Sequence, residues 1–127
     1  MNAESKDALS HLLIKERACF QDSVKIVSTL IHANAKGHGW WDSGDRNFGE
    51  QIALMHSELS EALEAWRKQI PESDHVEGMD AVVEELADTV IRIMDTCHKY
   101  DYDLGKAIID KMLFNVSREY KHGGKLI

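Results

Sequence analysis

Two stretches of the sequence decide the fold, Ser57-Glu-Leu-Ser-Glu-Ala-Leu-Glu64 and Glu84-Glu-Leu-Ala-Asp-Thr-Val-Ile91. Apolar residues recur in and around both stretches at three- and four-residue spacing, which predicts two amphipathic helices. Each stretch also carries two acids three residues apart, so the acids of a pair lie on one side of their helix. These acids are Glu58 and Glu61 in the first stretch, and Glu85 and Asp88 in the second. Two such helices packed side by side would bring the four carboxylates together.

Helical spacing extends over most of the 127 residues. It predicts helices over 5–35 (which could be interrupted near 16–20), 47–69, 77–100, and from the N-cap Asp103 to 120. No segment alternates between apolar and polar residues over a useful length, so the predicted fold class is all-α. The connections are short, which favours antiparallel neighbours in a four-helix bundle formed by one domain, residues 1–127.

The apolar stripes of the second and third helices define the predicted core. The stripe of the second helix comprises Ile52, Met55, Leu59, Leu63, Trp66 and Ile70, and that of the third comprises Val82, Leu86, Val90, Ile93 and Cys97. Trp66 is therefore expected in the core. The third helix is apolar on more than one side, because Ile91 adds a second face. We therefore expect a homodimer or homotetramer that shares helices across its interface.

The charge and the cysteine content of the chain limit which partners and which cellular compartment we expect. The chain has 22 acidic and 15 basic residues and a net charge of −7, which argues against nucleic acid or an anionic membrane as a partner. The N-terminal segment is charged and does not match a secretory signal. Cys19 and Cys97 are isolated among apolar residues, so we expect two buried free thiols and a cytoplasmic protein.

The two acid pairs predict a metal site. Four carboxylates in one place repel one another unless a divalent cation holds them, and oxygen ligands suit Mg²⁺, with Mn²⁺ as an alternative. Such an ion usually keeps waters and substrate phosphates in its coordination shell. A solvent-facing acidic helix would show the same spacing, and other pairs of acids at this spacing lie in or beside expected loops. Those pairs are Asp42/Asp45, Asp74/Glu77 and Glu77/Asp80.

The set of four acids, with 23 residues between Glu61 and Glu85, resembles the motif of the MazG-like, all-α nucleoside triphosphate pyrophosphohydrolase superfamily. The resemblance extends from about Gly39 to the C-terminus. It includes Lys111-x-x-x-Asn115-x-x-Arg118 and His122-Gly-Gly-Lys125, which are similar to a basic C-terminal segment of several members.

The resemblance implies Mg²⁺-dependent cleavage between the α and β phosphates of a nucleoside triphosphate, giving monophosphate and pyrophosphate. Nucleotide-pool house-cleaning would be the role. Glu58, Glu61, Glu85 and Asp88 would then be the metal ligands. A carboxylate not fully engaged by metal could take the proton of the attacking water, and Glu61 and Glu58 are the candidates.

Several other residues are candidates for substrate binding. Lys111, Asn115 and Arg118 follow one side of the fourth helix and could meet the triphosphate, as could Arg92; a solvated polar face is the alternative. Trp40 and Trp41 are adjacent, so one is expected to be buried while the other faces a pocket and stacks on a base. Both could instead seal the loop onto the core. His38 could contact the sugar or the base edge.

Other functions remain open at this point. No Glu-x-x-His pair accompanies the acidic motifs, which disfavours a di-iron bundle. A non-catalytic helical oligomerisation or regulatory module would also fit a charged helical chain. So would a phosphohydrolase of the same architecture with a narrower substrate, such as phosphoribosyl-ATP. The preferred base and sugar are not legible from the sequence.

Overall fold

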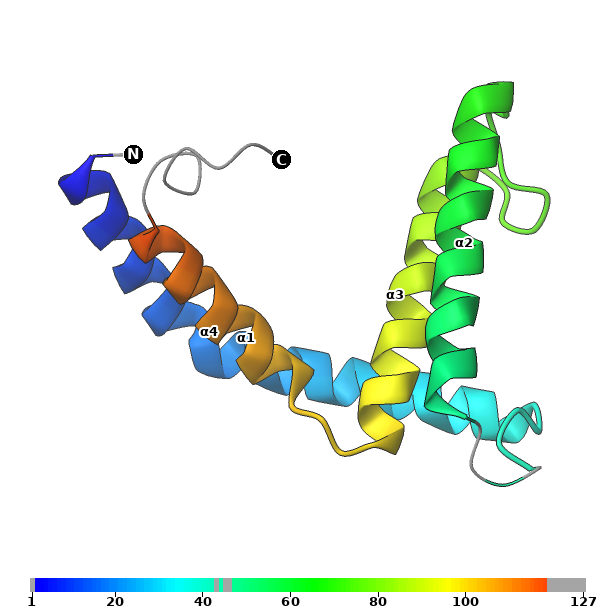
Figure 1. Cartoon of the computed structure of the whole chain (residues 1–127), viewed down its shortest axis with the longest axis horizontal. Coiled ribbons are helices and arrows are strands. Elements are labelled where there is room, and N and C mark those ends of the chain that lie inside the picture. The colour runs from blue at the N-terminus through cyan, green and yellow to red at the C-terminus, as the bar shows by residue number, and fades with distance from the viewer. Residues whose placement is uncertain (1, 43, 45–46, 119–127) are drawn as a thin grey trace. The chain divides into compact units, whose positions relative to one another are not determined.

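A computed structural model of the chain describes residues 2–42, 44 and 47–118. All the regular structure in these residues is helical (Figure 1), in the elements α1 (Ala3–Gly37), α2 (Phe48–Lys68), α3 (Ala81–Lys99) and α4 (Leu104–Ser117). The prediction of an all-α protein with four helices is confirmed. The helices form two compact units, Met1–Ile26 with Asp103–Ile127, and Val27–Tyr102. The single domain and the sharing of helices between subunits stay predictions.

Polar side chains fix where the helices begin. Asn47 accepts a hydrogen bond from the backbone of Gly49, and Asp103 accepts one from the backbone of Lys106 at 2.9 Å. Both satisfy amide groups that the first helical turn leaves without a partner. The prediction of Asp103 as an N-cap is confirmed.

The third helix begins four residues later than predicted. Asp80 accepts from the backbone amides of Val82 and Val83, so the first helical residue is Ala81 and not Glu77. The residues before it form a folded connector. Gly78 adopts a φ of 77°, which favours glycine, and its amide donates to Glu72 at 2.6 Å. The hydrogen bonds of this turn therefore set the start of α3, and the helical spacing of the residues before Ala81 does not.

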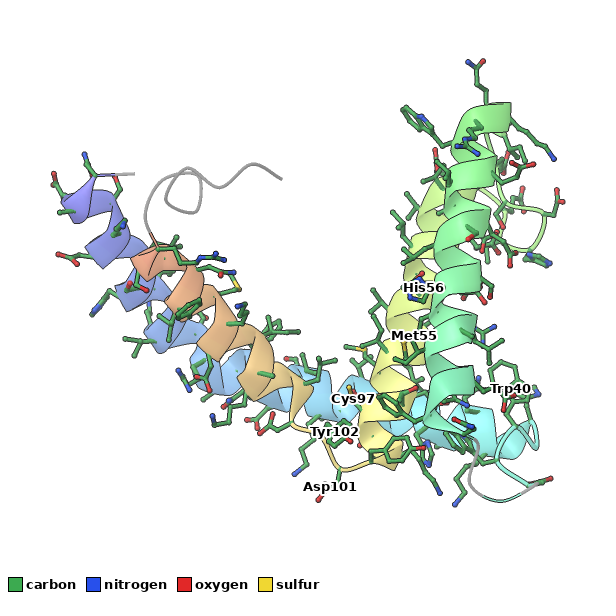
Figure 2. All side chains as sticks on the ribbon, in the orientation of Figure 1. Trp40, Met55, His56, Cys97, Asp101 and Tyr102 are labelled. Carbon is green, nitrogen blue, oxygen red and sulfur yellow. The ribbon has the colours of Figure 1, made fainter. Side chains whose placement is uncertain are left out.

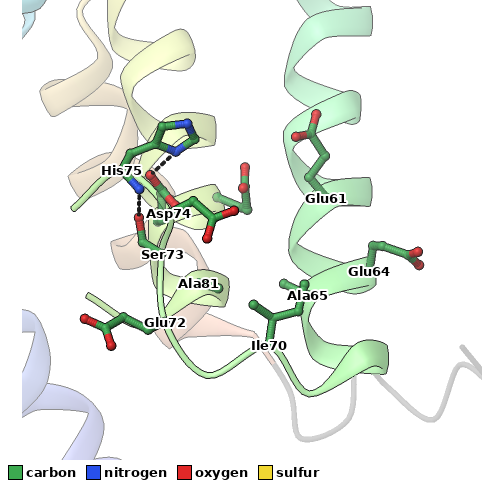
Figure 3. Close-up of a pocket in the computed structure, with 11 residues that line it drawn as sticks. Glu61, Glu64, Ala65, Ile70, Glu72, Ser73, Asp74, His75 and Ala81 are labelled. Atoms are coloured by element: carbon green, nitrogen blue, oxygen red, sulfur yellow. Dashed lines mark hydrogen bonds and ion pairs between the residues drawn. The ribbon is translucent and has the colours of Figure 1, made fainter. Parts of the chain in front are cut away.

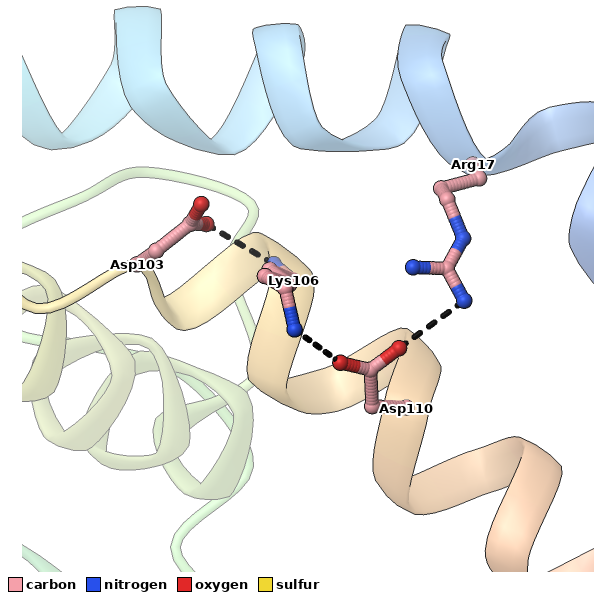
Figure 4. A network of polar contacts seen from close by, with 4 residues as sticks. All are labelled: Arg17, Asp103, Lys106 and Asp110. Atoms are coloured by element: carbon pink, nitrogen blue, oxygen red, sulfur yellow. Dashed lines mark hydrogen bonds and ion pairs between the residues drawn. The ribbon is translucent and has the colours of Figure 1, made fainter.

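The unit that contains α4 has a small apolar core against the first part of α1. Leu13, Ile109 and Val116 are buried, and Leu9, Phe20 and Leu113 pack on them. The helices approach closely at Gly105, where an added Cβ would lie 2.9 Å from the Cα of Gln21. Arg17 forms an ion pair with Asp110 at 2.8 Å, and Lys106 reaches the same carboxylate (Figure 4).

The prediction of a helix over 5–35 is confirmed, and the helix is continuous through residues 16–20, where the sequence left an interruption open. The expectation that Cys19 is buried was wrong: Cys19 is exposed, whereas its neighbour Phe20 packs against the apolar core. Cys97 is half-buried. Both thiols are free, as predicted.

In the other unit, α2 and α3 form an antiparallel hairpin (Figure 1). The residues that these helices bury are small or polar: Gln51, Glu58, Ala62 and Ala65 from α2, and Ala81, Thr89, Asp95 and Thr96 from α3. The predicted apolar stripes lie largely outside this contact. The expectation that Trp66 belongs to the core was wrong, since Trp66 is 72% exposed. Side chains cover the outer surfaces of the hairpin, with Met55 and His56 labelled on α2 (Figure 2).

The described helices include none with the length and apolar character that a membrane span needs.

Candidate metal centre

The structure brings three of the four predicted metal ligands together. Glu58 and Glu61 of α2 and Glu85 of α3 each place one carboxylate oxygen within 4.8 Å of the others. The pairing follows from the hairpin, because antiparallel helices set the acids of one helix opposite those of the next. Glu58 is buried, Glu85 is half-buried and Glu61 is exposed. The cluster is therefore anchored at one side and open to solvent at the other.

Arg92 of α3 compensates the most buried of these charges. Its Nε and Nη2 both donate to Oε1 of Glu58 at 2.6 Å, and the side chain of Glu58 is only 7% exposed. A buried carboxylate without a partner would be strongly destabilising, so this ion pair is what allows Glu58 to sit between the helices.

The pKa values of Glu85 and Asp88 reflect the carboxylates of the same charge that lie near them. The pKa of Glu85 is raised above its ordinary value, first by burial and then by the nearby carboxylates of Glu61 and Glu58. The pKa of Asp88 is also raised, first by partial desolvation of its carboxyl group and then by Glu58 and Glu84, with Arg92 acting in the opposite direction. Asp88 is exposed and does not belong to the 4.8 Å set. The repulsion expected from the sequence is therefore present.

A pocket of about 220 Å³ lies beside the cluster, between the ends of α2 and α3 and their connector (Figure 3). Glu61 and Glu85 line it, together with Asp74 and His75 of the connector. His75 pairs with Glu84 at 3.0 Å, and Ser73 accepts a hydrogen bond from the backbone amide of His75. The lining is predominantly acidic, so an anion such as a phosphate needs a cation there to bind.

A second polar group, at the opposite end of the hairpin, was missed in the sequence. The carboxylate of Asp95 is buried; one of its oxygens lies 2.6 Å from Nδ1 of His32, and the other accepts from Nε1 of Trp41 at 3.1 Å. An ionised carboxylate only accepts hydrogen bonds, so Nδ1 of His32 carries the hydrogen. The ring of His98 lies 4.7 Å from that of His32 between centroids, and the two ring planes are tilted by 36°. Asp95 follows Asp88 by seven residues, or two helical turns, so both acids lie on the same side of α3. This spacing was the sign in the sequence that Asp95 could belong to a polar group.

The contact with Asp95 distinguishes the two adjacent tryptophans by how exposed they are. Trp41 is half-buried and anchored to Asp95, whereas Trp40 is 46% exposed, with its ring 6.2 Å from that of His38 (Figure 2). The two rings therefore differ in exposure. Contact of either tryptophan with a base stays a prediction.

The basic candidates of α4 belong to the other compact unit. Lys111 places its Nζ 4.7 Å from the ring centre of Phe114, and the guanidinium of Arg118 lies 5.8 Å from the same ring. Asn115 is exposed. Their contact with a substrate stays a prediction, and the segment His122-Gly-Gly-Lys125 lies outside the described residues.

Comparison with protein-family models, with curated proteins and with solved structures found no match to this chain. The donor set consists of carboxylate oxygens only and is partly buried, and burial and the neighbouring carboxylates raise the pKa of Glu85. Oxygen ligands of this kind fit a hard divalent cation such as Mg²⁺.

The raised pKa of Glu85 predicts how metal binding depends on pH. In the metal-free protein Glu85 contributes stability below its ordinary pKa of 4.5, and that contribution is lost as the pH rises through its raised pKa. A cation binds the deprotonated form and offsets this loss. The increase in Tm caused by Mg²⁺ or Mn²⁺ should therefore grow from about pH 4 to about pH 7.

Thermal unfolding with and without the metal, at several pH values, measures this effect. Glu85→Gln should flatten the dependence on pH. The same Tm increase at every pH in the unmodified protein would contradict the assignment of Glu85 as a ligand.

Proposed function

We propose that this chain is a Mg²⁺-dependent nucleoside triphosphate pyrophosphohydrolase of the MazG-like type, acting in nucleotide-pool house-cleaning. It would cleave between the α and β phosphates. The observation that carries the proposal is the convergence of Glu58, Glu61 and Glu85 from two helices within 4.8 Å. An acidic face in a protein without a metal would be expected to spread these charges apart, since each carboxylate is better solvated alone.

The residues of the cluster have separable roles in this proposal. Bound Mg²⁺ supplies neutralisation of phosphate charge and lowers the pKa of a water. Glu58 and Glu85, buried and half-buried, fix the cation at the hairpin, with Asp88 as an additional ligand on the same face of α3. Glu61 is exposed, so water and substrate can reach it, and it is the candidate to accept a proton from the attacking water.

The ion pair with Glu58 suggests that Arg92 takes part in binding the triphosphate. Once a cation shares the charge of Glu58, the guanidinium can turn towards a phosphate oxygen, to which arginine donates two parallel hydrogen bonds. This exchange would couple metal binding to triphosphate binding. In-line attack on phosphorus depends mainly on such positioning and charge neutralisation.

The aromatic end of the hairpin supports a nucleotide as substrate. The anchor on Asp95 holds Trp41, while Trp40 and His38 are exposed. An exposed indole can stack on a nucleobase for about 1–3 kcal/mol and tolerates different bases. Lys111, Asn115 and Arg118 are proposed partners of the triphosphate or of the leaving pyrophosphate.

One experiment tests the reaction. The purified protein is incubated with a panel of ribo- and deoxyribonucleoside triphosphates and Mg²⁺, and the products are separated. We expect monophosphate and pyrophosphate from at least one member, and none of either when EDTA is added. Diphosphate and phosphate as products would refute the assigned bond. Turnover of phosphoribosyl-ATP alone, included in the panel, would replace the free nucleotide with the narrower substrate.

A non-catalytic oligomerisation module is the second candidate, and the exposed apolar residues of α2 and α3 favour it. It predicts no turnover of any substrate in the panel at any metal concentration. The two candidates are therefore separated by the same experiment.

A further inference from the structure

Two histidines from different helices lie next to each other near the C-terminal end of α3. They are His32 of α1 and His98 of α3, and both belong to the compact unit Val27–Tyr102. Their ring centroids are 4.7 Å apart. His98 is exposed and the side chain of His32 is 14% exposed, so the pair lies at the surface. Neither histidine belongs to the carboxylate cluster.

The buried carboxylate of Asp95 fixes which nitrogen of His32 is available to a ligand. One oxygen of Asp95 lies 2.6 Å from Nδ1 of His32, and an ionised carboxylate only accepts hydrogen bonds. Nδ1 therefore carries the hydrogen, and in the neutral ring the lone pair is on Nε2. Because Nε1 of Trp41 donates to Asp95 at 3.1 Å, the carboxylate is itself held in place.

This arrangement is typical of histidines that bind a metal ion. A ligating imidazole usually donates its other N–H to a carboxylate, which fixes the tautomer and the ring orientation and makes the ligating nitrogen more basic. His32 has this partner in Asp95. A histidine–aspartate pair with a purely structural role would have the same hydrogen bond, but it would need no second imidazole beside it.

His98 supplies that second imidazole. Metal–nitrogen bonds of about 2.1 Å place the centroids of two imidazoles on one ion about 5 Å apart. The observed separation of His32 and His98, 4.7 Å, is close to this value. His98 follows Asp95 by three residues, so α3 places the second ligand about one turn from the carboxylate that orients the first.

We propose that His32 and His98 bind a divalent transition-metal ion, with Asp95 as the positioning residue of His32. Imidazole nitrogen suits Zn²⁺, Cu²⁺ and Ni²⁺, whereas Mg²⁺ prefers oxygen ligands. The histidine pair and the carboxylate cluster therefore select different ions. Water completes the coordination, and the bound ion links α1 to α3. This site does not depend on the proposed function.

The test is a calorimetric titration of the full chain, without an affinity tag, with Zn²⁺. Excess Mg²⁺ is present to occupy the carboxylate cluster. We expect one Zn²⁺ per chain. His98→Gln should weaken its binding by at least ~100-fold, because loss of an outer partner alone costs ~10–100-fold. His56→Gln, at an exposed histidine of α2, is the matched control and should keep the affinity of the unmodified chain.

Asp95→Asn tests the positioning role separately. The amide nitrogen would donate to Nδ1 of His32, so the ring hydrogen moves to Nε2 and the lone pair there is lost. Zn²⁺ affinity should fall by ~10–100-fold although both histidines remain. Unchanged affinity in this variant would overturn the role of Asp95.

Two results would overturn the site itself. One is the absence of Zn²⁺ binding in excess Mg²⁺. The other is a Zn²⁺ affinity of His98→Gln equal to that of the unmodified chain, with circular dichroism showing that both are folded. If Glu61→Gln then lost the binding instead, the ion would belong to the carboxylate cluster. Since His98 is exposed, its replacement should leave the helices intact.

Discussion

Glu61→Gln should lower the turnover of nucleoside triphosphates by at least ~100-fold while the protein stays folded. Glu61 is the exposed member of the carboxylate cluster, and the change removes one negative charge with little change of shape. Both proposed roles of the residue depend on that charge, because an amide neither binds Mg²⁺ strongly nor accepts a proton. Mg²⁺ affinity, measured by titration calorimetry without substrate, should fall in parallel.

Glu50→Gln is the control for this prediction. Glu50 is an exposed acid on the first turn of the same helix, outside the cluster, so its variant should retain turnover and metal affinity. Circular dichroism of both variants verifies that the helices persist. Full activity of Glu61→Gln would show that Glu61 takes no part in the reaction. Lost activity with unchanged Mg²⁺ affinity would leave it as proton acceptor only.

Asp95→Leu should destabilise the protein by about 2–4 kcal/mol, because two half-buried donors, Nδ1 of His32 and Nε1 of Trp41, lose the buried carboxylate that they share. Nδ1 of His32 lies 2.6 Å from one carboxylate oxygen, and Nε1 of Trp41 donates to the other at 3.1 Å. Asp95→Asn should have a smaller effect. The amide oxygen can still accept from Trp41, and His32 can change tautomer to accept from the amide nitrogen.

Urea unfolding followed by circular dichroism, at one fixed protein concentration, measures both changes. Asp22→Leu is the matched control, since Asp22 is an exposed helical aspartate of α1. Equal stability of Asp95→Leu and the control would show that the buried hydrogen bonds are not stabilising. An Asp95→Asn variant less stable than Asp95→Leu would contradict the tautomer argument.

Much of the fold could be predicted from spacing and capping alone. Helical periodicity indicated four helices, and Asp103 was correctly identified as a cap. The start of α3 was misplaced, because Asp80 and Gly78 form a specific connector whose hydrogen bonds outweigh the helical preference of the residues between them.

The interior of the hairpin was harder to predict. Apolar spacing placed Trp66 in the core, yet alanines form the contact between α2 and α3 and Trp66 is exposed. Periodicity identifies a side of a helix that avoids water, but it does not say whether the same chain or another covers it. Asp95 was missed for a related reason, since its partners His32 and Trp41 are more than fifty residues away in sequence.

The helices, their order and the two acid pairs follow from the sequence alone, because helical propensity, caps and three-residue spacing act between near neighbours. Which carboxylates meet, the pairing of Arg92 with Glu58, and which apolar side chains stay exposed depend on tertiary packing. Those outcomes depend on the rotation of one helix against another. That rotation is set by contacts between distant residues, where small alanines allow close approach and large side chains do not.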